Sequence, residues 1–141
     1  MATNRLVGAV IQTFKHGTSI VYSATTEGGS GHANKNFWVS MDGNDTVNLA
    51  NNDTVLAGEL LEVSADGYCT VATSGNGLGG IMATASGVTA GSKLVGAQGD
   101  TVNGQNTGYL KNATATQANS RGIATSVSGT AKNSTVTVNF P

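Results

Sequence analysis

Hydrophobic residues come in short runs separated by Gly, Asn, Asp and Ser, and the alternation within these runs predicts β-strands. The clearest run is the last, where Val136, Val138 and Phe140 alternate with polar residues, so we expect one face of that strand to be buried. No stretch between the closely spaced glycines follows the helical period. The predicted strands are residues 6–14, 19–24, 37–41, 59–64, 68–73, 80–85, 93–97, 122–127 and 134–140.

Two Asp-Gly pairs predict tight turns, because glycine supplies the positive φ that such turns require. The pair at residues 66–67 joins the two strands of a hairpin over residues 59–72, and the pair at residues 42–43 ends an earlier strand. Residues 44–55 are polar and rich in Asn, which indicates an irregular connection with one short strand. The glycine-rich residues 75–80 are predicted to form a loop between two strands.

The same landmarks occur twice in the chain. The pairs Gly-Tyr, Ala-Thr, Gly-Ile and Ser-Gly follow one another from Gly67 and again from Gly108, so that the two copies cover residues 67–97 and 108–138. All of these residues are small, turn-forming, aromatic or β-branched, which indicates a duplicated backbone shape and not a duplicated reaction. Two such units, packed face to face or side by side, predict a small β-sandwich or barrel.

A length of 141 residues suits a single domain. The repeat lies within residues 37–141, which we expect to form the β domain. Residues 1–36 have no counterpart in the repeat and are predicted to form an amino-terminal arm that ends in a flexible loop over residues 27–36. The predicted fold class is therefore all-β, as a single-domain small β-sandwich or barrel with an extended amino-terminal arm.

Charge is scarce in this chain. Charged residues make up 11% of it and the net charge is −1. Because the seven Lys and Arg are scattered, we expect no basic surface for phosphate and no nucleic-acid partner. The weak charge gives little repulsion between copies, which favours self-association. The apolar run at residues 6–11 is too short for a membrane span and has no cleavage pattern, so we expect neither a membrane partner nor a signal peptide.

Several short stretches match part of a cofactor or metal motif, but the neighbouring residues do not complete it. Residues 75–80 match the G-x-G-x-x-G pattern of dinucleotide sites, but the β-prone residues that follow cannot begin the helix that the pattern needs. A calcium loop at residues 42–45 would need a Glu at its twelfth position, which is absent. His16 and His32 have no Cys or His at ligand spacing. We therefore expect no cofactor and no metal.

No nucleophile is paired with a base in the sequence. Cys69, the sole cysteine, follows a hairpin in mid-strand and is predicted to be a small buried thiol. The carboxylates Asp53, Glu59, Glu62 and Asp66 could include an acid–base pair for glycoside hydrolysis, but nothing in their spacing favours that over solvated strand edges. We expect the protein not to be an enzyme.

Phe37 and Trp38 are the candidates for a partner contact. Adjacent residues on a strand face opposite sides, so if one ring fills the core the other must meet solvent, a neighbouring subunit or a partner. Burial of the second ring under the long amino-terminal segment is the alternative, and the sequence favours neither.

A third set of landmarks runs through residues 55–102. It consists of two Ala-Gly pairs, a turn glycine, an Ala-Thr pair and a Gly-Ile pair, interspersed with apolar strands. The residues are Ala57-Gly58, Gly67, Ala72-Thr73, Gly80-Ile81 and Ala90-Gly91. In this order the segment, about a third of the chain, resembles the capsid decoration (cement) proteins of tailed bacteriophages.

The resemblance implies an all-β protein that binds the outer surface of a phage capsid, usually as a homotrimer, and stabilises the shell. Its partners would be the major capsid protein and other copies of itself, and its location the virion surface after synthesis in the host cytoplasm. Two alternatives stay open. One is a tail, fibre or baseplate β-structural protein, and the other is a carbohydrate-binding β module that stacks sugars on Trp38, Tyr22, Tyr68 and Tyr109.

Overall fold

The computed structural model describes residues 7–22, 37–83, 87–97, 107–113, 120–131 and 133–141. These residues contain no helix, so the prediction of a small, single all-β domain is confirmed. The strands are β1 (Val7–His16), β2 (Trp38–Gly43), β3 (Thr46–Leu49), β4 (Gly58–Val63), β5 (Tyr68–Ile81), β6 (Leu94–Ala97), β7 (Tyr109–Asn112), β8 (Ile123–Val127) and β9 (Thr135–Phe140).

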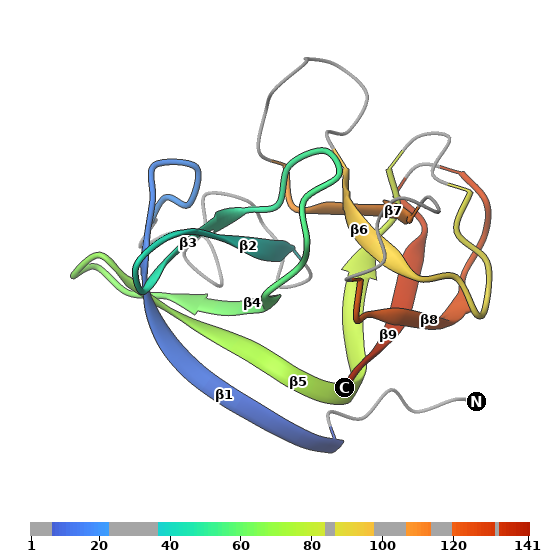
Figure 1. Cartoon of the computed structure of the whole chain (residues 1–141), viewed down its shortest axis with the longest axis horizontal. Coiled ribbons are helices and arrows are strands. Elements are labelled where there is room, and N and C mark those ends of the chain that lie inside the picture. The colour runs from blue at the N-terminus through green and yellow to red at the C-terminus, as the bar shows by residue number, and fades with distance from the viewer. Residues whose placement is uncertain (1–6, 23–36, 84–86, 98–106, 114–119, 132) are drawn as a thin grey trace.

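Five strands close into a barrel in the order β1, β3, β2, β4 and β5, because β1 pairs with β3 on one edge and with β5 on the other. These strands form the left half of the molecule in Figure 1. Apolar side chains fill the barrel, as expected for a barrel of this size. The buried members of this core are Ile20, Phe37, Val39, Val47, Leu49, Leu60, Val63, Cys69 and Val71.

A second lobe is built on the far end of β5. That end pairs with β9, which in turn pairs with β8, while β6 and β7 form a separate two-stranded sheet beside them (Figure 1). This lobe has its own hydrophobic core, and β5 runs through both lobes. The core consists of Trp38, Ala50, Leu56, Ala72, Leu78, Met82, Val88, Leu94, Leu110, Ala124, Val136, Val138 and Phe140.

The predicted loop over residues 75–80 is wrong, because β5 continues through it without interruption. β9 pairs with this segment from Gly75 to Ile81, so the backbone has ladder partners despite its glycines. Positive φ angles at Gly75 and Gly77, with a bulge between Asn76 and Leu78, turn the strand from the first lobe into the second.

The sequence repeat has a structural counterpart in which the two copies are hydrogen-bonded to each other at equivalent positions. The Met82 N–H donates to the Ser134 carbonyl oxygen, and the Ala124 N–H donates to the Ser92 carbonyl oxygen, both at 2.9 Å. The extent of the pairing differs between the copies. The Gly-Ile segment of the first copy ends β5 and pairs with β9, the third strand of the second copy, whereas β8 pairs with β9 of its own copy and meets the first copy only through an isolated bridge between Lys93 and Ile123.

The turn before each third strand is also repeated. In the first copy the Ser92 N–H donates to the Thr89 carbonyl at 3.0 Å, and in the second the Ser134 N–H donates to the Ala131 carbonyl at 3.1 Å. The third residue of each turn has positive φ, and it is Gly91 in one copy and an asparagine in the other. Both residue types tolerate this conformation, so the turn is kept although the letters differ.

The first strands of the two copies have different surroundings. Tyr68 begins β5 and lies opposite Lys15 of β1, whereas Tyr109 begins β7 and lies opposite Ala97 of β6. The core of the second lobe nevertheless draws side chains from both copies. Only the later part of each copy therefore keeps a common pairing pattern.

The amino-terminal third differs from the expected arm where the structure describes it. β1 pairs with β5 from Val7 to Lys15 and with β3 at its end, because β5 would otherwise have an open edge there, so this segment is a wall of the barrel. The predicted strand at residues 19–24 is wrong where the structure describes it, because residues 18–19 form a turn and residues 20–22 are not in a strand. Ile20 is buried in the barrel core, and the Ser19 N–H donates to Asn48 Oδ1. Residues 1–6 and 23–36 lie outside the described residues.

Several local predictions are confirmed. β4 and β5 form the predicted hairpin, with Gly67 at positive φ in its turn. β3 is the one short strand expected between residues 44 and 55. In β9, Val136, Val138 and Phe140 are buried while the residues between them are not.

Candidate functional site

Both rings of the candidate contact pair, Phe37 and Trp38, are buried, so of the two alternatives left open by the sequence the structure has burial of the second ring. Trp38 lies in the core of the second lobe, packs edge-on against Phe140 at 5.1 Å, and donates from Nε1 to the Gly79 carbonyl at 2.7 Å. Phe37 lies in the barrel core and stacks on Tyr109 at 5.6 Å. The alternation rule holds, but each side of this strand faces a hydrophobic core of its own.

The four rings of the carbohydrate-binding alternative differ in their exposure to solvent. Trp38 is buried, and one face of the Tyr109 ring is covered by Phe37. Tyr22 and Tyr68 are exposed.

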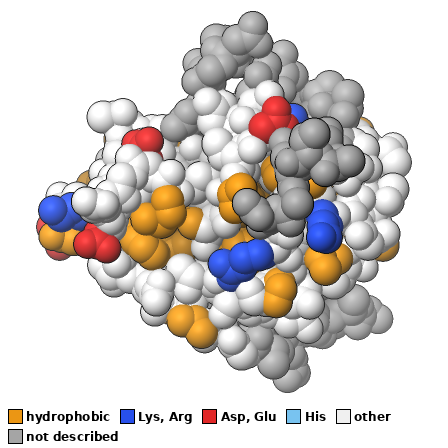
Figure 2. Space-filling view, viewed as in Figure 1, with side chains coloured by type: hydrophobic (Ala, Val, Ile, Leu, Met, Phe, Trp, Pro, Cys, Tyr) orange, Lys and Arg blue, Asp and Glu red, His pale blue; other side chains and the backbone are white. Residues whose placement is uncertain are grey.

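An apolar hollow of about 540 Å³ is lined by residues of β1 and β2, by residues 54–57 and by two further residues, Thr73 and Arg121. We call it the mouth hollow. Figure 2 shows hydrophobic side chains gathered on the left half of the visible face, with a basic side chain to their right. Residues from distant parts of the sequence line the hollow. They are Gln12, Phe14, Ser40, Met41, Thr54, Val55, Leu56, Ala57, Thr73 and Arg121.

Two apolar side chains of the mouth hollow are open to solvent. Met41 is 52% exposed and Val55 is 46% exposed. Val10 and Ile11 of β1 are exposed to a similar degree. A group of this kind on an otherwise polar surface is typical of a site that contacts another molecule.

Arg121 is the one charged residue among those that line the mouth hollow. Its guanidinium lies 4.2 Å from the centre of the Phe140 ring and donates hydrogen bonds to backbone oxygens of Thr73 and Pro141. These contacts hold the cation in place at the rim. The hollow therefore combines an apolar floor with a fixed positive charge.

Glu59 is a buried acid at the junction of the two lobes. It lies on β4 opposite Trp38 and Ala72, is 5% exposed, and its Oε1 accepts a hydrogen bond from the Gly79 N–H at 3.4 Å. Burial raises the pKa of this carboxyl to about 8, against a smaller opposing effect of the Gly79 hydrogen bond. The group is mostly neutral at pH 7. It and the indole of Trp38 bond to the same residue, Glu59 through the Gly79 N–H and Trp38 through the Gly79 carbonyl.

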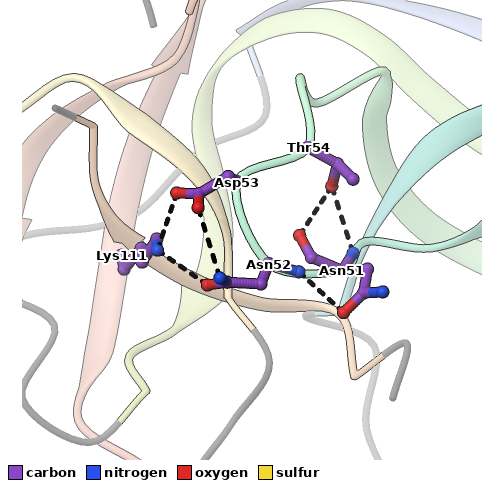
Figure 3. A network of polar contacts seen from close by, with 5 residues as sticks. All are labelled: Asn51, Asn52, Asp53, Thr54 and Lys111. Atoms are coloured by element: carbon purple, nitrogen blue, oxygen red, sulfur yellow. Dashed lines mark hydrogen bonds and ion pairs between the residues drawn. The ribbon is translucent and has the colours of Figure 1, made fainter. Parts of the chain in front are cut away.

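The other carboxylates of the predicted set lie in separate settings. Asp53 forms an ion pair with Lys111 at 2.7 Å, and Asn52 bonds to both, so that this turn is fastened to β7 (Figure 3). Asp66 accepts a hydrogen bond from the Tyr68 N–H in the hairpin turn, while Glu62 is exposed on β4. The contacts of these groups are those of turns and strand edges.

Thiol and imidazole chemistry has little support in the described residues. Cys69 is buried as predicted, and burial raises the pKa of its thiol to about 11. His16 is at the end of β1, with Nδ1 3.0 Å from the Gly17 carbonyl oxygen, and His32 lies outside the described residues. The described segments contain no group of three or more His, Cys, Asp or Glu that could hold a metal ion.

Within the described residues, no helix has the length and apolar character needed to cross a membrane.

Sequence reasoning missed the mouth hollow. Met41 was placed on a predicted strand without a role, and Arg121 was not singled out. One signal was present in the sequence of β1. Val10 and Ile11 are adjacent and both apolar, so on a strand one of them must lie on the exposed side, and no charged residue between Gly8 and Phe14 protects that strand.

Comparisons with known proteins add no relative: no family model matches the chain, and neither a curated protein nor a solved structure matches it.

Proposed function

We propose that this protein is a structural component of a phage virion that binds the outer surface of the capsid and stabilises the shell. The observation that carries the proposal is the mouth hollow of the barrel, where the apolar side chains of Met41 and Val55 are exposed on a chain with a net charge of −1. Such a surface suits contact with another protein, since exposed apolar groups lose water there.

The resemblance supplies the kind of partner. Three of its five landmarks fall at a strand start or in a turn: Gly58 begins β4, Gly67 is in the hairpin turn, and the glycine at residue 91 is in the turn before β6. The other two, residues 72–73 and 80–81, lie within β5. Weak contacts of this type are effective when a symmetric lattice repeats them many times. The partner in this proposal is the major capsid protein, and the protein binds it as a homotrimer.

The test is to add the purified protein to capsids of tailed phages that lack their decoration protein and to image the particles by electron microscopy. The expected result is density on the outer surface at threefold and quasi-threefold positions, with shells that resist heating better than bare ones. Absence of such density from every shell tested would refute the proposal. Location in a tube or an elongated fibre would instead favour the tail, fibre or baseplate alternative.

A further inference from the structure

Among the described strands, the edge of β1 that faces away from β5 is paired only at one end. Its pairing with β3 is confined to Lys15 and His16, and no other described strand pairs with this edge. On the opposite edge, β1 follows β5 from Val7 onward. Within the described part of the chain, the backbone from Gly8 to Phe14 therefore has one row of donors and acceptors without a partner strand.

The direction of individual N–H groups follows from two hydrogen bonds. The Lys15 N–H donates to the Asp45 carbonyl on the side of β3, and the His16 N–H donates to the Gly67 carbonyl on the side of β5. Because N–H groups alternate between the two edges of a strand, those of Ile11 and Thr13 point to the open edge.

This edge lacks the features that usually protect strand edges. Natural edge strands carry Lys, Pro or inward-pointing charge, which oppose the addition of another strand. Between Gly8 and Phe14 there is neither a charged residue nor a proline, and Val10 and Ile11 are 49% and 52% exposed. The edge is therefore suited to accept a strand.

The mouth hollow lies beside this edge, on the side to which Gln12 and Phe14 point. A strand added next to β1 would place alternate side chains on that side. A volume of about 540 Å³ is larger than the cavity of about 150 Å³ that holds one benzene ring, so the hollow has room for more than one apolar side chain. Arg121 also lines the hollow; its Nε and Nη2 already donate to the Thr73 and Pro141 oxygens, so a carboxylate would be bound by its positive charge and its Nη1.

We infer that the open edge of β1 and the mouth hollow form a docking site for one extended segment of a partner protein, with apolar side chains in the hollow and an acidic side chain against Arg121. The segment adds to β1 by main-chain hydrogen bonds, and the hollow and the cation select its side chains. Under the proposed function, on which this assignment of the partner rests, the segment belongs to the capsid protein.

The first experiment does not need the capsid. A library of random dodecapeptides is selected for binding to the whole protein, and affinities of the selected peptides are measured by fluorescence anisotropy. The expected peptides alternate apolar and polar residues and contain an Asp or Glu. Failure to select any peptide, or selection of peptides without this pattern, would overturn the inference.

Variants then locate the binding site. Thr13→Pro removes an N–H from the open edge and leaves the pairing with β5, so affinity should fall about tenfold or more, whereas Thr13→Val keeps the N–H and should bind within about twofold. Val55→Asp places a negative charge in the hollow and should weaken binding by a similar factor. Its control is Val21→Asp, because Val21 is also exposed, at 55% against 46% for Val55, but is not among the lining residues. If Thr13→Pro binds as well as Thr13→Val, and Val55→Asp as well as Val21→Asp, the peptide does not bind at the β1 edge and the mouth hollow.

A charge exchange tests the acidic position. Arg121→Glu should weaken binding of an acidic peptide, and replacing the acid of that peptide by Lys should restore it. Urea unfolding of each variant shows whether it is folded, and if Thr13→Pro is not, Val55→Asp and the charge exchange decide. Lack of rescue means that the cation does not select the segment.

Two further outcomes separate the possible occupants. If the wild-type protein forms oligomers in light scattering and Val55→Asp makes it a monomer, the edge is covered by a second copy and the inference is overturned. On decorated shells, equal occupancy by wild type and Thr13→Pro refutes the docking site but leaves the proposed function intact. If the protein binds the selected peptides but binds to no shell, the docking site is supported and the proposed function is refuted.

Discussion

The buried carboxyl of Glu59 makes the stability of this protein depend on pH in an unusual direction. Its pKa in the folded protein is about 8, above the ordinary 4.5, so the folded chain keeps a proton that the unfolded chain releases. The stabilisation is fully present below pH 4.5 and is lost as the pH rises through 8. Between the two values the slope is about 1.4 kcal/mol per pH unit.

From pH 5 to pH 8 the expected loss of unfolding free energy is therefore about 3 to 4 kcal/mol, a large fraction of the total for a domain of this size. Glu59→Gln removes the titration and keeps an oxygen for the Gly79 N–H, so the variant should lack this slope and be more stable than wild type at pH 8. The measurement is urea unfolding at several pH values, with m-values checked for constancy.

Glu62 supplies the control, because it is exposed on the same strand. Glu62→Gln should keep the slope of the wild type. If the wild-type free energy is level between pH 5 and pH 8, or if Glu59→Gln retains the slope, then the carboxyl is not held neutral in the folded protein and the reasoning is wrong.

Three further predictions concern packing and the thiol. Trp38→Ala should cost about 3 to 5 kcal/mol in urea unfolding, since it empties a core site and removes a hydrogen bond, whereas unchanged stability would rule out a core role. Gly58→Ala should destabilise by about 1 to 3 kcal/mol, because an added Cβ would overlap the Ala72 carbonyl oxygen. The matched change Gly129→Ala meets only the Ser134 side chain and should cost less in the same assay. Cys69 should fail to react with a disulfide reagent at pH 8 until the protein is unfolded, and fast reaction of the folded protein would contradict its burial.

Elements with local patterns could be predicted from the sequence. β9 was found because its alternation of apolar and polar residues is complete, and the β4–β5 hairpin because Gly67 fits its turn. The glycine-rich half of β5 has no such pattern. Its strand conformation depends on pairing with β9, which is far away in the sequence, so propensity alone assigns a loop there.

The site could be predicted less well, for two physical reasons. The rule that adjacent strand residues face opposite sides is valid for Phe37 and Trp38, but it says nothing of how many cores a chain has. The mouth hollow is assembled from β1, β2, residues 54–57 and Arg121, which no local spacing connects. From the sequence alone, its apolar residues cannot be distinguished from core residues, because only the fold shows that they lie at an opening.

The hydrogen bonds between the two copies of the repeat constrain the order in which the chain can fold during synthesis. Met82 finds its backbone hydrogen-bond partners at Asn133 and Ser134, and the end of β5 finds its sheet neighbour in β9, the last strand. While the ribosome is still adding residues, the barrel strands can associate but the second lobe cannot close. A chain interrupted before β9 would leave the first copy of the repeat without its pairing partner, exposed to aggregation and proteolysis.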